Sequence, residues 1–203
     1  MQLRFGSDAV RVLREDTVFR GHFAVREVSL QHRCFEGGWS DPLRREIFDR
    51  GDAVGVLPYH PASDSLVLIE QFRPGAMRAE ECPWMLELVA GVVEPGEDDS
   101  DVVHREAREE AACELDALEH IACFYPSAGA CSEQVRLFCG RVTAAGVGGV
   151  HGVADEGEDI LVHSVPRRDA LRLLQEGRIT NGHTLIALQW LALQGDALRE
   201  RWT

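Results

Sequence analysis

The chain has 203 residues, of which 45% are hydrophobic and 27% charged, which is the composition of a soluble globular protein of one or two domains. Its 34 acidic and 21 basic residues give a formal net charge of −13, a sign that repels nucleic acids and anionic membranes, so neither is expected as a partner. All of the basic residues are arginines, which excludes chemistry that depends on a lysine nucleophile or a phosphate-binding lysine.

The cysteine pattern and the N-terminal residues indicate the cellular compartment. The 6 cysteines form no CxxC pair and no regular framework, and a chain of this length does not need disulfides, which favours a reducing compartment. The opening MQLRFGSDAVRVLRED lacks the apolar core of a signal peptide, and no apolar run is long enough to span a membrane. We therefore expect a cytoplasmic protein with no membrane partner.

The first half of the chain is predicted to form mainly strands. Residues 1–50 alternate between apolar and polar and turn at Gly37-Gly38, which predicts short strands joined by tight turns. Two apolar runs, residues 53–60 and 65–72, flank a Pro-Ala-Ser-Asp turn and predict a hairpin. The run MLELVAGVV at 85–93 predicts one further strand. A domain boundary is expected near Gly51, which divides the chain into residues 1–50 and 51–203.

The second half adds helices to the predicted sheet. The EPGE turn at 94–97 precedes N-capping residues and a helix to about residue 113. Strands are expected at 118–125, 133–142 and 160–165, with a glycine-rich acidic loop over 144–159. Two helices follow, and in the second Leu185, Leu188, Leu191 and Leu193 are expected near one side. This order predicts an α+β fold, an α/β/α layered domain with an N-terminal β sub-domain.

Three glutamates on the first predicted helix carry the clearest chemical signal. At about 100° per residue, Glu106, Glu109 and Glu110 share an arc of about 100° on one helix face. Clustered carboxylates repel one another, and such hard oxygen donors favour Mg²⁺ or Mn²⁺. Arg105 lies four residues before Glu109 and is also placed to reach back to Glu97, which would tie the loop to the helix.

A solvated acidic face is the simpler explanation for the helix taken alone. The preceding loop argues against it, because six fixed identities at these spacings would occur by chance with a probability on the order of 10⁻⁴. These six residues are Gly91, Glu97, Arg105, Glu106, Glu109 and Glu110.

The same residues resemble the Nudix box, G-x5-E-x7-R-E-U-x-E-E-x-G-U, in which U is a bulky aliphatic residue. Three positions depart from it: Ala107 and Cys113 are small at U positions, and Ala112 replaces the last glycine. The resemblance extends from Arg14 to Trp202 and is closest to bacterial ADP-ribose pyrophosphatases of the Nudix superfamily. It implies a Nudix α/β/α sandwich with a mixed sheet, and an N-terminal β sub-domain exchanged between the subunits of a homodimer.

The resemblance also implies a set of metal ligands and a base. Glu106, Glu110 and the backbone carbonyl of Ala90 would hold Mg²⁺ or Mn²⁺, and Arg105 belongs to the same catalytic group. In the acidic loop, Glu158 would add a ligand and Glu156 would act as general base, with Glu109 as the other candidate for the base. The alternative is a solvated acidic loop without a role.

Six further residues match substrate-binding positions of similar enzymes. Arg45 and Arg73 correspond to arginines that hold the adenine end and the phosphates, and Glu133 and the backbone near Val92 lie where the adenosine and the terminal ribose are bound. His22 and Phe23 would reach into the partner subunit's site. The alternatives are surface ion pairs for the arginines, a core position for the phenylalanine and a surface position for the histidine.

The function implied is Mg²⁺-dependent hydrolysis of ADP-ribose, a nucleoside diphosphate sugar, to AMP and ribose 5-phosphate. Two alternatives remain open at this point. One is a Nudix hydrolase of another nucleoside diphosphate sugar such as GDP-mannose, and the other is a Nudix-like regulator that binds a nucleotide without turnover. The complete set of box carboxylates argues against the regulator.

Overall fold

The structure, a computed structural model, describes residues 2–78, 82–144, 148–153 and 157–203. The chain divides into two compact units. The N-terminal unit comprises Met1–Asp52 and Tyr125–Gln134, and the larger unit comprises Ala53–Phe124 and Val135–Thr203. The expected division near residue 50 had placed 125–134 in the second domain. In the structure this segment joins the N-terminal unit, because Phe48 N donates to Ala130 O at 2.7 Å and Phe48 O accepts from Ser132 N at 3.1 Å.

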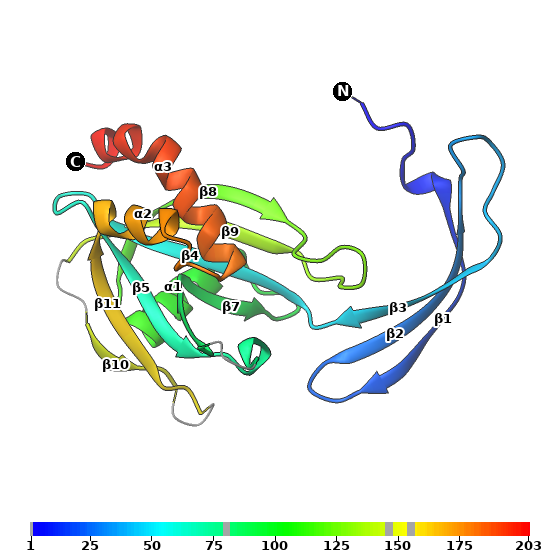
Figure 1. Cartoon of the computed structure of the whole chain (residues 1–203), viewed down its shortest axis with the longest axis horizontal. Helices are drawn as coiled ribbons and strands as arrows, with labels where there is room; N and C mark the ends of the chain where they lie inside the picture. The colour runs from blue at the N-terminus through cyan, green and yellow to red at the C-terminus, as the bar shows by residue number, and fades with distance from the viewer. Residues whose placement is uncertain (1, 79–81, 145–147, 154–156) are drawn as a thin grey trace. The chain divides into compact units, whose positions relative to one another are not determined.

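The N-terminal unit contains an antiparallel sheet in the order β1-β2-β3 (Figure 1). Its elements are η1 (Ser7–Ala9), β1 (Val10–Arg20), β2 (Ala24–His32) and β3 (Leu43–Asp49). Gly37 and Gly38 have φ of 103° and 76°, which only glycine adopts readily, so they set the turn between β2 and β3. One face of the sheet is rich in apolar residues, namely Val10, Val12, Val28, Leu30, Leu43 and Ile47.

The larger unit is built on a mixed sheet of eight strands, six of them in the order β10-β11-β5-β4-β9-β8, with β6 paired to β5 and β7 to β4. β4 and β9 run parallel, and the other strand pairs whose register is described run antiparallel. The strands are β4 (Asp52–His60), β5 (Ser65–Phe72), β6 (Trp84–Glu87), β7 (Val89–Val93), β8 (Leu115–Phe124), β9 (Val135–Val142), β10 (Gly149–His151) and β11 (Ile160–Pro166).

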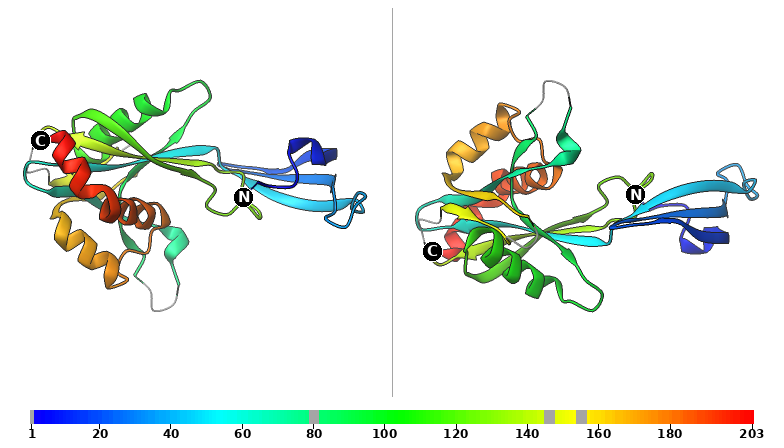
Figure 2. Two further views of the ribbon diagram at one scale, coloured as in Figure 1. Left: turned by 90° about the horizontal axis from the view of Figure 1, so that it is seen from above. Right: turned by 90° about the horizontal axis from the view of Figure 1, so that it is seen from below.

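Helices cover both faces of this sheet. α1 (Asp99–Ala111) lies on one face, whereas α2 (Arg167–Gln175) and α3 (Gly182–Trp202) lie on the other, as Figure 2 shows, and a short η2 (Pro74–Ala76) follows β5. The larger unit is thus the α/β/α sandwich that the sequence led us to expect. Among the described residues, no helix combines the length and apolar character needed to cross a membrane.

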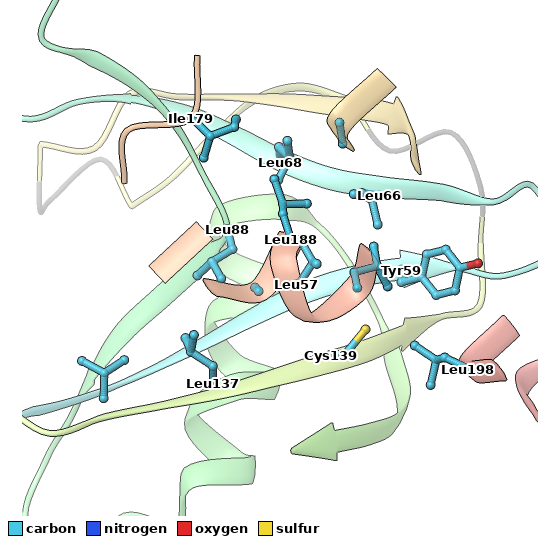
Figure 3. Packing of buried hydrophobic residues seen from close by; sticks show 14 of the residues in the cluster. Leu57, Tyr59, Leu66, Leu68, Leu88, Leu137, Cys139, Ile179, Leu188 and Leu198 are labelled. Carbon is cyan, nitrogen blue, oxygen red and sulfur yellow. The ribbon is translucent and has the colours of Figure 1, made fainter. Parts of the chain in front are cut away.

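Strand β4 explains why the layers form. Its side chains alternate between the two faces: Val54 and Val56 pack toward α1, whereas Leu57 and Tyr59 pack toward α3. A strand buried on both faces must be apolar at nearly every position, as AVGVLPY is. The α3 side is a cluster of leucines around β4 and β5, to which α3 contributes Leu188 (Figure 3).

Three expectations about local structure were wrong. The run at 85–93 is not one strand, because the chain changes partner at Leu88, from β5 to β4. The loop over 144–159 contains β10, which pairs with β11. Leu193 is 82% exposed, whereas Leu188 and Leu191 are buried, because residue 193 has turned away from the side that these two share.

Candidate active site

The loop before α1 is held by its own polar groups. Asp98 caps the helix, its carboxylate accepting from Ser100 N at 2.9 Å. Glu97 folds back, and its Oε2 accepts from Glu94 N at 2.9 Å. Gly96 adopts φ 93°, which the turn requires. The predicted loop-then-helix unit therefore forms, with the helix over residues 99–111.

Ala112 caps the C-terminal end of α1 in the left-handed conformation that is typical of glycine. Ala112 has φ 48° and ψ 33°, and its N–H donates to Arg108 O at 3.0 Å. This 5→1 bond is that of the αL motif, and the next N–H, of Cys113, donates to Ala107 O at 2.8 Å. Ala107 and Cys113 are 0% and 1% exposed, so the small residues at the two aliphatic box positions are core residues.

Gly91 makes room for Glu106. A Cβ added at Gly91 would lie 2.0 Å from Glu106 Oε1, which no side chain tolerates. The carboxylate of Glu106 therefore lies directly against the backbone of β7. Arg105 Nη1 donates to the same Oε1 at 2.8 Å.

Arg105 connects the loop with the helix, as its spacing predicts. In addition to Glu106, its guanidinium contacts Glu109 at 3.3 Å and Glu97 at 3.9 Å. It thus places positive charge among three carboxylates. Glu109 is the most accessible of the three helix glutamates, its side chain being 41% exposed.

Glu110 is buried, 3% exposed, and its Oε2 accepts from Ala90 N at 3.1 Å. Burial raises the pKa of Glu110 to about 8, opposed by the Ala90 hydrogen bond and increased by the charges of Glu106 and Glu158. Burial likewise raises the pKa of Glu106 to about 7, with Arg105 opposing and Glu109 adding to the shift. Two adjacent carboxylates are therefore held where their anionic forms are unfavourable.

Glu158 and Arg73 lie close enough to act on these carboxylates. The charge of Glu158 raises the pKa of both Glu106 and Glu110, and it also supports the charged form of Arg73. Glu158 Oε2 accepts from Val153 N at 3.0 Å, which turns it toward its own loop. The other acidic-loop candidate, Glu156, lies outside the described residues.

Sequence reasoning missed Glu87, which is 3% exposed on β6. Its carboxylate accepts from Arg73 Nε at 3.1 Å and from Nη2 at 2.7 Å. A glutamate within the apolar run MLELV was the available signal, because a buried carboxylate needs a cationic partner. Arg73, expected to hold substrate phosphates, is thus oriented by a buried ion pair.

A divalent cation fits the residues that are present. Within the described ranges, no three side chains of the types Asp, Glu, His and Cys already form a metal cluster. Glu106 and Glu110 nevertheless supply two carboxylates on one helix face, disfavoured as anions until a positive charge offsets them. Oxygen donors of this kind suit Mg²⁺ or Mn²⁺ better than zinc.

The other expected substrate residues lie partly in the N-terminal unit. Arg45 is exposed on β3, beside Val28 in the register, and Nη1 donates to Arg44 O at 2.8 Å. His22 and Phe23 pack edge to face with ring centroids 4.5 Å apart.

Glu133, also in the N-terminal unit, is 5% exposed and pairs with Arg50 at 3.5 Å. Val92, on β7 of the larger unit, is 42% exposed. The structure therefore brings together Ala90, Glu106, Glu110, Glu158 and Arg73 within one unit, whereas Arg45, His22, Phe23 and Glu133 belong to the other.

Comparison with known proteins finds similar chains and a similar fold. The chain is 43% identical over 202 residues to the ADP-ribose pyrophosphatase of Escherichia coli (strain K12), covering 100% of this chain and 97% of the relative. It is 40% identical over 201 residues to the ADP-ribose pyrophosphatase of Haemophilus influenzae, covering 98% and 93%. The solved structure of an ADP compounds hydrolase matches with a TM-score of 0.66 at 21% identity, covering 92% and 96%, and this shows a shared fold.

Residues 49–178, which include β4 to β11, α1 and α2, match the family model of the NUDIX domain. This range contains the glycine, the arginine and the glutamates whose contacts build the site on α1. Together with full-length identities of 40–43% to two relatives, the match shows that this chain belongs to the NUDIX family.

Proposed function

We propose that this protein hydrolyses the pyrophosphate bond of ADP-ribose in the presence of Mg²⁺, giving AMP and ribose 5-phosphate. The observation that carries the proposal is the pair Glu106 and Glu110, which lie against β7 with raised pKa values, Glu110 buried and Glu106 partly buried. The relatives named ADP-ribose pyrophosphatase, similar over the whole chain, support the choice of substrate.

The metal would be held by Glu106, Glu110, Glu158 and the carbonyl of Ala90. When bound, Mg²⁺ would supply the positive charge that offsets the pyrophosphate oxygens and makes the attacking water more acidic. Arg105 keeps Glu106 in place through its 2.8 Å contact, and Ala90 N keeps Glu110 in place. Glu158 Oε2 accepts from Val153 N within its own loop, which leaves Oε1 available to serve as a ligand.

Glu156 would take the proton of the attacking water, and Glu109 is the other candidate for this step. The two assignments are separable by kinetics. Glu156→Gln is expected to lower kcat by on the order of 10²-fold with little change in KM, since a base acts in the transition state. An unchanged kcat in Glu156→Gln together with a loss in Glu109→Gln would transfer the role to Glu109.

The substrate-binding residues that we propose follow the resemblance. Arg45 and Arg73 would hold the adenine end and the phosphates, and Glu133 and the backbone near Val92 would contact the adenosine and the terminal ribose. His22 and Phe23 would come from the partner in a homodimer, assembled through the N-terminal sheet. The exposed apolar side chains of Val10 and Val12, on the apolar face of that sheet, support this assembly. The cytoplasm remains the compartment that we propose.

A panel of nucleoside diphosphate sugars tests the proposal. Release of product from ADP-ribose, GDP-mannose and related compounds would be measured with Mg²⁺ and with EDTA. We expect the highest kcat/KM for ADP-ribose and no turnover in EDTA. Preference for GDP-mannose would select the second hydrolase activity. Binding of nucleotide without turnover of any compound would select a regulator.

A further inference from the structure

Leu88 is where the strand that leads to the Nudix box changes its hydrogen-bonding partner. β6 ends at Glu87 and pairs with β5, whereas β7 begins at Val89 and pairs with β4. Leu88 is 1% exposed, and its N–H donates to Thr184 Oγ1 at 2.9 Å. A side chain 96 residues further along the chain therefore satisfies the buried backbone at this crossover.

The hydroxyl of Thr184 is held in one orientation by the start of α3. Asn181 caps this helix, and its Oδ1 accepts from Thr184 N at 2.9 Å and from Thr184 Oγ1 at 3.0 Å. The hydroxyl therefore donates to Asn181 and accepts from Leu88 N. Thr184 is 0% exposed, so water does not compete for either bond.

The crossover lies between two contacts of the candidate active site. One residue before it, Glu87 binds the Arg73 guanidinium at 2.7 Å. Two residues after it, Ala90 N binds Glu110 Oε2 at 3.1 Å. A shift of the backbone at Leu88 would thus disturb both contacts.

We propose that Thr184, oriented by Asn181, is a positioning residue of the active site: its hydroxyl fixes the crossover so that Glu110 and Ala90 are presented for a divalent metal. The inference rests on the proposed function. Thr184 lies beyond residues 49–178, so this contact comes from the C-terminal helix and not from the segment that matches the NUDIX model. Residues that orient metal ligands contribute to affinity for the metal.

The test is the affinity for Mn²⁺ in the absence of substrate, measured from the free-ion signal in electron paramagnetic resonance. Thr184→Val keeps the shape of the side chain but removes the hydroxyl, and we expect Mn²⁺ binding to weaken on the order of 10-fold. Thr184→Ser restores the hydroxyl and should return the affinity to within about twofold of the wild type. Melting temperature is recorded for every variant.

Leu198→Ala is the control for lost stability. Leu198 packs beside Tyr59 and Cys139, away from Leu88 (Figure 3). This variant should melt earlier than the wild type and still bind Mn²⁺ normally. If Thr184→Val also bound Mn²⁺ like the wild type, Thr184 would serve folding alone and the inference would be wrong.

A second variant keeps the test available if Thr184→Val does not fold. Asn181→Ala removes the acceptor that orients the hydroxyl, so Mn²⁺ binding should weaken severalfold, and wild-type affinity would overturn the inference. Failure of the wild type itself to bind Mn²⁺ would reject the proposed metal site. Wild-type binding combined with unaffected variants would reject only the role of Thr184 and Asn181.

Discussion

Burial disfavours the charged forms of the Glu106 and Glu110 carboxylates, and the stability of the folded protein therefore depends on pH. Their pKa values, about 7 and about 8, lie above the ordinary value of 4.5. The folded protein therefore binds protons that the unfolded chain has already released between about pH 4.5 and pH 8. The stability that these protons provide is present at low pH and is lost as the pH rises through the folded pKa values.

We therefore expect the metal-free protein to melt at a lower temperature at about pH 9 than at about pH 5, as calorimetry in EDTA would measure. Glu110→Gln cannot ionise, so its melting temperature should fall less over the same range. Glu114→Gln, at a side chain that is 70% exposed, is the control and should behave like the wild type. Equal slopes in Glu110→Gln and the wild type would contradict the burial argument.

Gly91 is a second residue on which the position of the Glu106 carboxylate depends. A methyl group there would meet the end of the Glu106 side chain, so Gly91→Ala should displace this carboxylate without unfolding the protein. We expect kcat/KM for ADP-ribose to fall on the order of 10²-fold with a nearly unchanged melting temperature. Gly182→Ala, where an added Cβ meets nothing within 4 Å, should keep wild-type activity. Activity of Gly91→Ala within about twofold of the wild type would show that Glu106 need not lie against β7.

At the scale of the element, α1 ends in a strained residue. Ala112 holds a left-handed conformation that glycine adopts without strain, so Ala112→Gly should raise the free energy of unfolding by roughly 0.5–1 kcal/mol. Denaturant unfolding measures this change. The control is Ala111→Gly, at the buried last residue of the helix, which should lower stability by about 1 kcal/mol. Destabilisation by both changes would show that the left-handed conformation of Ala112 is not a source of strain.

The elements show how far the sequence alone could predict the molecule. The loop, the cap and the helix with its glutamates were predictable, because each depends on neighbours within about one or two helical turns. The break at Leu88 was not, since it depends on pairing with β5 and β4 and on Thr184, far away in the chain. Glu87 could have been found, because a glutamate inside the apolar run MLELV indicates a buried carboxylate, but its partner Arg73 could not be read from the spacing. The raised pKa values of Glu106 and Glu110 follow from burial, which the spacing of residues in the sequence does not reveal.

At the scale of the whole molecule, one face of the N-terminal sheet exposes apolar side chains of β1, namely Val10 at 47% and Val12 at 59%. Surfaces of this kind usually belong to an interface. We expect the full chain to sediment as a dimer of twice 22.5 kDa at micromolar concentration, and deletion of residues 1–50 to abolish both the dimer and the activity.

A single substitution tests the same interface without removing the N-terminal sheet. Val12→Glu should shift sedimentation toward the monomer, because a charge would be buried against the partner. Leu193→Glu, at an 82% exposed leucine on α3 in the larger unit, should leave the dimer intact. A monomeric full-length protein that still hydrolyses ADP-ribose would show that each site is complete within one chain, and the assignment of His22 and Phe23 to the partner's site would be wrong.

The most direct test of the whole account is the rate at which the purified protein forms AMP from ADP-ribose, followed by chromatography with Mg²⁺ and with EDTA, for the wild type and Glu110→Gln. We expect equal amounts of AMP and ribose 5-phosphate with Mg²⁺ and none in EDTA. Glu110→Gln should lower kcat by on the order of 10²-fold while the protein stays folded. Full turnover in excess EDTA, or wild-type turnover by Glu110→Gln, would contradict a metal site built on the buried carboxylates of α1.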